Sequence, residues 1–245
     1  MIIIKSPEEI ATMRQCGKIL AAILDKLRTE IKPGIKTYQL DIVMAEESRR
    51  RKVKPSFKGY QGFPANLCVS VNDEIVHGIP GERVLKDGDI VSLDAGVIYH
   101  GFHSDSAITV GVGEISQQAR ELIEVTENSL EAGIAQANCG AHVRDISAAI
   151  QDYVESRGFS VVREYTGHGV GRDLHEDPQV PNFAFKNGPL LRKGMVIAIE
   201  PMVNAGDWHT RLAPNQWTVL TINGILSAHF EHTVAITDGK ADILT

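Results

Sequence analysis

One stretch of residues occurs twice in the chain, and this repetition constrains the fold more than any other feature. Residues Leu85–Asp94 match Leu191–Glu200 in type, at an offset of 106 positions (94 to 200). The same offset relates Gly34 to Gly140, so the similarity begins well upstream of the matched stretch. Similarity at a constant offset indicates an internal duplication. We therefore predict a fold made of two related halves.

Length and composition agree with one compact unit. A chain of 245 residues with 43% hydrophobic residues can bury one large core. We predict a single domain over residues 1–245, with halves at about 1–112 and 113–245. The net charge of -6 gives no general attraction to nucleic acid or to anionic membranes. No apolar run is long enough for a signal peptide or a membrane span.

The three cysteines are too few and too widely spaced for a disulfide framework. They occur at Cys16, Cys68 and Cys139. An odd, scattered set of cysteines is typical of reduced thiols. We therefore expect a cytoplasmic protein.

Local patterns predict four helices with strands between them. Ser6 and Pro7 form a helix start, and apolar residues then recur at helical spacing to about residue 30. Similar patterns predict helices at 37–51, 116–138 and 144–157. Strands are expected at 67–71 and 158–163, and glycine-rich loops at 57–66 and 165–178.

The segment Asp87–Val110 reads as a β-hairpin, because it has two β-branched arms with glycines between them. We expect Asp94 to face Asp105, which puts two carboxylates roughly 5 Å apart at Cβ. Like charges at that distance repel each other. Either one of the two is protonated or both share a cation.

The second half offers three further candidates for the same site. Glu200 ends an apolar run that should be buried, and a buried carboxylate needs a partner. Glu231 follows His229 as Asp105 follows His103, and His168 lies among glycines that allow close approach. Those glycines lack the strand-to-helix context of a phosphate loop. Four carboxylates and one imidazole suit two divalent first-row ions, which together can activate a water for hydrolysis.

These five residues and their neighbours resemble the metal-binding set of the methionine aminopeptidases. The similar strings are Asp-Ala-Gly at Asp94, His-Ser-Asp at Asp105, Gly-His-Gly-Val-Gly at His168, Ile-Glu-Pro at Glu200 and Phe-Glu-His-Thr at Glu231. The resemblance covers nearly the whole chain and fits the short type I form typical of bacteria. It implies the α/β (α+β) pita-bread fold, with an antiparallel sheet inside and helices outside. It also implies two divalent ions (Co, Mn, Fe, Zn or Ni) bound by all five residues.

The resemblance assigns further roles to single residues. It implies that His77 contacts the scissile amide, that His175 donates a hydrogen bond to the carbonyl and developing oxyanion, and that Glu200 shuttles a proton. The methionine pocket maps onto Tyr60, Phe63, Cys68, Leu174 and Trp217. Relatives typically carry tyrosine at position 63, phenylalanine at position 174 and cysteine at position 57. The stretch 209–214 matches no assigned motif.

The expected activity is removal of the N-terminal methionine from nascent polypeptides when the second residue is small. The expected partners are those N-termini, with ribosome association left open, and we expect a monomer. One alternative is a proline-selective relative, an Xaa-Pro aminopeptidase or prolidase, although such enzymes usually carry an additional N-terminal domain. The other alternative is a catalytically inactive pita-bread protein that binds a partner, which the intact ligand set disfavours.

Overall fold

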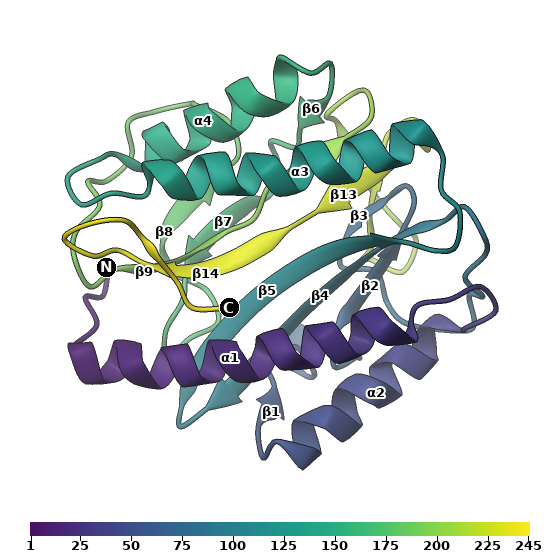
Figure 1. The fold of residues 1–245 in the computed structure, drawn as a ribbon, viewed down its shortest axis with the longest axis horizontal. Helices are drawn as coiled ribbons and strands as arrows, with labels where there is room; N and C mark the ends of the chain where they lie inside the picture. The colour runs from purple at the N-terminus through teal and green to yellow at the C-terminus, as the bar shows by residue number, and fades with distance from the viewer.

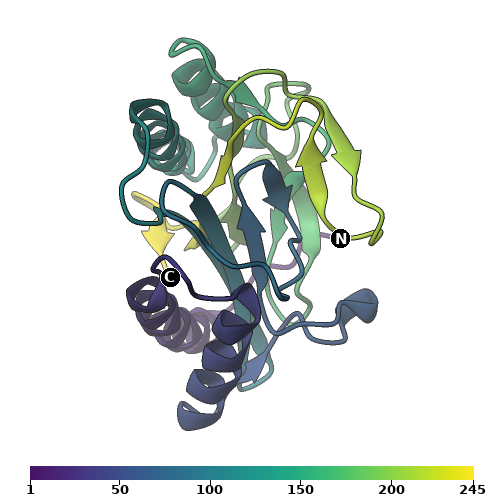
Figure 2. The same cartoon turned by 90° about the vertical axis from the view of Figure 1, so that its right-hand side faces the viewer.

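A large antiparallel sheet forms the centre of the molecule, and four helices lie along one side of it (Figures 1 and 2). A computed structural model describes all 245 residues. The helices are α1 (Pro7–Glu30), α2 (Thr37–Arg50), α3 (Gln117–Gln136) and α4 (Val143–Glu155). No helix combines the length and the apolar character that crossing a bilayer requires. The central antiparallel sheet and the four helices outside it confirm the predicted α/β (α+β) arrangement.

The central sheet has nine strands, and its main path runs β1-β4-β5-β14-β9-β7-β8. In addition, β2 pairs with β4 and β15 pairs with β14. The nine strands are β1 (Lys54–Pro55), β2 (Cys68–Val71), β4 (Ile90–Tyr99), β5 (Phe102–Gly111), β7 (Thr166–Gly169), β8 (Glu176–Pro181), β9 (Val196–Ile199), β14 (Glu231–Ala235) and β15 (Asp242–Ile243).

Two small sheets complete the strands. One consists of β6 (Ser160–Val161), β10 (Met202–Asn204) and β13 (Ser227–His229). The other consists of β3 (Glu74–Val76), β11 (Thr210–Leu212) and β12 (Val219–Thr221). The hairpin of β11 and β12 lies on the side of the central sheet opposite to the helices (Figure 2). A short 3-10 helix, Tyr60–Gly62, precedes β2.

The helices bury their apolar faces on the sheet in two separate clusters, one for each half. Helices α1 and α2 pack on β2 and β4 through residues such as Leu20, Leu40 and Leu93. Helices α3 and α4 pack on β9 and β13 through residues such as Leu122 and Ile150. Burial of apolar area is the main stabilising term in folding, so each half has its own core.

Positions related by the offset of 106 make matching backbone hydrogen bonds in the two halves. Before each half's second helix, a glycine with positive φ donates to the carbonyl that opens the repeated stretch. Gly34 (φ 93°) donates to Leu85 at 2.8 Å, and Gly140 (φ 89°) donates to Leu191 at 2.9 Å. Isolated bridges join Lys36 to Val84 and His142 to Leu190, again 106 positions apart (36 to 142, 84 to 190). The two halves therefore repeat one local structure.

The halves meet at the seam between β5 and β14. Only two residue pairs, Ala107 with Glu231 and Ser106 with His232, are in register there. On either side, a threonine hydroxyl replaces direct backbone pairing. The Thr109 hydroxyl donates to the His229 carbonyl (2.7 Å) and accepts from its amide (2.9 Å). Thr233 makes the equivalent pair of bonds to the backbone of Asp105.

Helix positions agree with the sequence patterns. Ser6 caps α1 with a reciprocal hydrogen-bond pair, in which its hydroxyl accepts from the Glu9 amide and the Glu9 carboxylate accepts from the Ser6 amide. Ser116 likewise caps α3. All four predicted helices are confirmed within a few residues at each end.

The predicted hairpin is confirmed, but its predicted register is wrong by two positions. Asp94 pairs with Ala107, and Asp105 pairs with Gly96. The turn residues are His100 (φ 49°) and Gly101 (φ 79°). Positive φ at both central positions is characteristic of a type I′ hairpin turn, and Gly101 adopts it without strain. The expected register would have placed Tyr99 and His100 at the two central positions of the turn.

Two other local predictions need correction. His168 does not lie in a loop, because it belongs to β7, which pairs with β8 and β9. The strand expected at 158–163 is reduced to Ser160–Val161. Glycine-rich sequence favours loops in isolation, whereas here the neighbouring strands satisfy the backbone of β7.

Candidate metal centre

Adjacent strands of the central sheet bring the five predicted metal ligands together. Asp94 lies on β4, Asp105 on β5, Glu231 on β14 and His168 on β7, and Glu200 directly follows β9. Residues in register across a sheet project to the same face. Ala107 is in register with Asp94 on one side and Glu231 on the other. The small side chain of Ala107 therefore lies between these two carboxylates on one face of the sheet.

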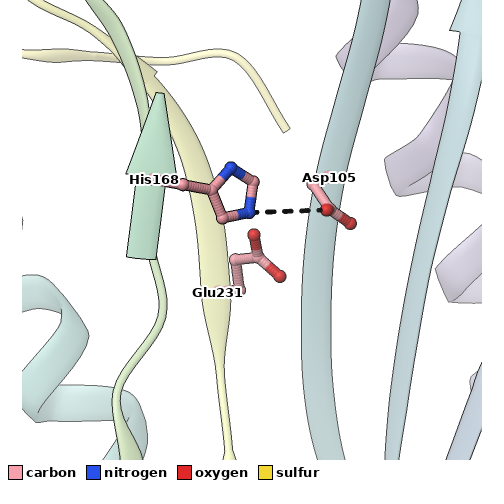
Figure 3. A group of neighbouring side chains, drawn as sticks. All are labelled: Asp105, His168 and Glu231. Atoms are coloured by element: carbon pink, nitrogen blue, oxygen red, sulfur yellow. Dashed lines mark ion pairs between the residues drawn. The ribbon is translucent and has the colours of Figure 1, made fainter. Parts of the chain in front are cut away.

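Asp105, His168 and Glu231 form the centre of this cluster (Figure 3). Each offers one potential ligand atom, and these atoms lie within 4.8 Å of one another. His168 Nε2 is 3.9 Å from Asp105 Oδ2 and 3.5 Å from Glu200 Oε1. All three central residues are buried.

The imidazole of His168 is oriented for ligation. Its Nδ1 lies 2.9 Å from the Gly169 carbonyl, which can only accept, so Nδ1 carries the proton. The lone pair of Nε2 is then directed at the carboxylates. Burial, assisted by the charge of His175, lowers the pKa of His168 to about 3. A neutral imidazole whose other nitrogen donates to a carbonyl is the usual form of a metal-binding histidine.

The carboxylates are electrostatically unsatisfied without a cation. Burial raises the pKa of Asp94 to about 7, against the effect of a hydrogen bond with the Cys68 thiol. Burial and the charges of neighbouring carboxylates raise the pKa of Asp105, Glu200 and Glu231 well above their usual values. Asp94 Oδ1, Asp105 Oδ1 and Glu231 Oε1 are buried without a hydrogen-bond partner. Oxygen-rich, unpartnered and anionic, this donor set fits divalent cations.

The raised pKa values predict how the metal-free protein responds to pH. Unfolded aspartates titrate near pH ~4, whereas Asp94 in the fold titrates at about 7. The folded state therefore holds more protons in this window, and its stability falls as pH rises through it. Six histidines with a lowered pKa act in the opposite direction, because below pH ~6.5 the unfolded state binds protons that their folded forms do not. We therefore expect the carboxylate effect to appear as a pH-dependent difference in Tm between the metal-free protein and a variant with one carboxylate fewer.

A variant isolates this effect from the other titrating groups. Asp105→Asn removes one of the repelling charges, so the Tm of its metal-free form, relative to that of the metal-free wild type, should rise between about pH 5 and about pH 8. Scanning calorimetry on chelated protein measures both. An equal pH response in the two proteins would contradict the electrostatic account.

One pocket contains all twelve predicted site residues. Besides the five of the cluster, its wall includes His77, His175, Tyr60, Phe63, Cys68, Leu174 and Trp217. The apolar part of the wall is a small cluster of its own in which Phe63 and Trp217 pack edge to face at 5.2 Å. Trp217 lies between β11 and β12, so the hairpin containing residues 209–214 carries it to the pocket.

His175 and His77 border the carboxylate cluster. Tyr60 Oη lies 2.8 Å from His175 Nδ1, and the rings of His175 and His168 have centroids 4.1 Å apart. Burial lowers the pKa of His175, and burial with the charge of His175 lowers the pKa of His77 to about 4. Both imidazoles are therefore neutral near pH ~7, so each has one N–H donor.

The sequence patterns did not single out two further pocket residues, Phe57 and Gln61. Position 57 stands out in the sequence only as a difference from the pattern typical of relatives. Gln61 lies in the 3-10 helix with a left-handed backbone (φ 49°). A single glutamine belongs to no recognisable motif, and positive φ at a non-glycine residue is not indicated by the residue type.

The fold and this cluster together define a class of metal-dependent hydrolases. The model of "Metallopeptidase family M24" matches residues 11–238. The chain therefore belongs to metallopeptidase family M24. It is 54% identical to methionine aminopeptidase 1 of Bacillus subtilis, over 100% of this chain and 99% of that protein. Within the family, it groups with the methionine aminopeptidases.

Solved structures agree with this placement and with the pita-bread fold. The methionine aminopeptidase of Thermotoga maritima superimposes with a TM-score of 0.98 at 47% identity, covering 100% of this chain and 99% of that one. The prolidase of Pyrococcus furiosus gives a TM-score of 0.80 at 22% identity. That alignment covers 99% of this chain but only 65% of the prolidase, so it shows a shared fold.

Proposed function

We propose that this protein is a dinuclear metal-dependent aminopeptidase that removes the N-terminal methionine from nascent polypeptides when the second residue is small. The observation that carries the proposal is one pocket in which five buried metal-binding side chains adjoin an apolar wall. The similarity to methionine aminopeptidases over the full chain supports the choice of substrate.

Asp94, Asp105, His168, Glu200 and Glu231 would hold two divalent ions. Ions bound there would supply an activated water and would polarise the carbonyl of the substrate. An oxygen-rich ligand set with one imidazole accepts several first-row ions. Metal analysis of protein purified from cells would identify which of Co, Mn, Fe, Zn or Ni it uses.

The protein's own side chains provide the remaining chemistry. Glu200, at the edge of the cluster, accepts a proton from the attacking water and passes it to the leaving amine. His175 donates a hydrogen bond to the carbonyl oxygen, where negative charge develops in the transition state. Its interaction with Tyr60 Oη holds the ring in place for this role. His77, which also lines the pocket, contacts the scissile amide.

The methionine side chain would occupy the apolar part of the pocket. Phe63, Leu174 and Trp217 offer contacts there, and Tyr60 and Cys68 complete the wall. An unbranched thioether adapts its shape to such a surface and interacts favourably with aromatic rings. Positions 57, 63 and 174 differ from the pattern typical of relatives, which changes the detailed shape of the pocket.

We also propose that the protein acts as a monomeric single domain in the cytoplasm. Its three cysteines are free, in agreement with a reducing compartment. Action on nascent N-termini implies encounters with the ribosome, where those N-termini emerge.

A peptide panel tests the activity. Metal-stripped protein refilled with each candidate ion should cleave Met-Ala-Ser and should leave Xaa-Pro peptides intact. Preferential cleavage of the Xaa-Pro peptides would favour a proline-selective peptidase instead. No cleavage under any metal, despite saturable metal binding, would favour the inactive partner-binding alternative.

Capped substrates provide a second, independent prediction. A free α-amine near the cluster can use its lone pair, whereas a formyl group delocalises that lone pair into an amide and adds bulk against the carboxylates. We therefore expect cleavage of Met-Ala and Met-Gly starts and no cleavage of formyl-Met-Ala. Mass spectrometry of products measures this directly. Efficient release of formyl-methionine, or cleavage at an internal methionine, would show that the amine is not recognised in this way.

A further inference from the structure

His229, at the end of β13, is a buried side chain that the proposed chemistry does not use. It is 1% exposed, and neither of its ring nitrogens has a hydrogen-bond partner within the protein. A buried polar group without a partner destabilises the folded state. Leucine or phenylalanine would fill the same space without that cost, so packing alone does not explain an imidazole here.

The surroundings of His229 indicate which partner is intended. Its Nε2 lies 3.9 Å from Glu200 Oε2. The other oxygen of that carboxylate, Oε1, lies 3.5 Å from His168 Nε2. The Glu200 carboxylate is therefore flanked by two imidazoles, with one oxygen toward the metal-binding cluster and the other toward His229.

The backbone of His229 is held at the seam between the halves. The Thr109 hydroxyl bonds both its carbonyl and its amide, and His229 is in register with Met202 of β10. Met202 lies two residues beyond Glu200. The side chains of His229 and Glu200 therefore project from neighbouring backbone segments that are fixed by strand pairing. The imidazole can therefore restrain the carboxylate without moving itself.

We propose that His229 is a positioning residue, whose Nε2–H donates to Glu200 Oε2 and holds this carboxylate in the orientation that proton transfer requires. The 3.9 Å separation is too long for a direct bond. A small rotation of the carboxylate, or one bridging water, closes it. This inference rests on the role proposed for Glu200.

A matched pair of variants separates hydrogen bonding from packing. Glutamine and methionine have similar length, but only glutamine carries an N–H donor. His229→Gln should retain kcat and Mn²⁺ affinity within a few-fold. His229→Met should lower kcat by roughly 10- to 100-fold with little change in KM, and should weaken Mn²⁺ binding to metal-stripped protein by a similar factor.

Calorimetric titration with Mn²⁺ measures the affinity independently of turnover. Ser227→Ala, on the same strand, removes the buried hydroxyl that donates to the Val203 carbonyl and controls for loss of strand stability. His229→Phe is a second variant without a donor, in case His229→Met does not fold. A donorless variant with unchanged kcat and Mn²⁺ affinity would overturn the proposal, and so would equal losses in the Gln and Met variants. Cleavage of Met-Ala-Ser by the unmodified enzyme tests the proposed function separately.

Discussion

Changing Asp105 or Glu231 to alanine should lower peptidase activity by several orders of magnitude, and chelation of divalent ions should abolish it. Both carboxylates are buried at the centre of the cluster, and each has an oxygen without a partner in the protein. Removing either one leaves a bound cation with fewer ligands and the remaining charges uncompensated. Peptide hydrolysis by wild-type, variant and chelated protein, each with measured metal content, tests both statements.

Glu121→Ala provides the control, because Glu121 is an exposed carboxylate on α3 that does not line the pocket. It should change neither activity nor metal content. Full turnover by protein shown to be metal-free would contradict the dinuclear account. Retained activity in Asp105→Ala or Glu231→Ala would remove that residue from the ligand set.

His175→Ala should lower kcat by roughly 10² to 10³ while KM changes little. The reason is that an N–H donor at the carbonyl oxygen stabilises charge that appears only in the transition state. Steady-state kinetics on a variant with unchanged Tm and metal content is the measurement.

The neighbouring residue supplies the contrast. Leu174 belongs to the apolar wall, and Leu174→Ala should act mainly on KM because it removes contacts made before and during the reaction alike. If His175→Ala behaves like Leu174→Ala, with a pure effect on KM, His175 only positions the substrate.

The grouping of the four carboxylates with His168 could be anticipated from the sequence because charge is costly to bury. Glu200 after an apolar run and Asp94 in a β-branched hairpin arm each raise the question of a partner, and the duplicated pattern relates the two. Helix ends were equally visible, since the Ser6 cap is a local interaction. These features depend on residues close in the chain or on burial that hydrophobic patterning reveals.

Features that depend on backbone detail were not predictable. The hairpin register changed by two because the turn selected His100 and Gly101, a choice that pattern counting does not resolve. Membership of Gln61 in the pocket follows from a left-handed backbone, and the isolation of His229 follows from packing between strands remote in sequence. Each requires knowing which distant groups meet, and the chain's local preferences do not determine this.

The candidate metal centre spans the seam between β5 and β14, which lie side by side (Figure 1). The first half contributes Asp94 and Asp105 to the cluster, and the second contributes His168, Glu200 and Glu231. The halves are also joined by the pairing of β3 with β12 and by the packing of Met13 and Phe102 against Val196. Ions held at the cluster would lie between side chains of both halves and would add a further connection across the seam.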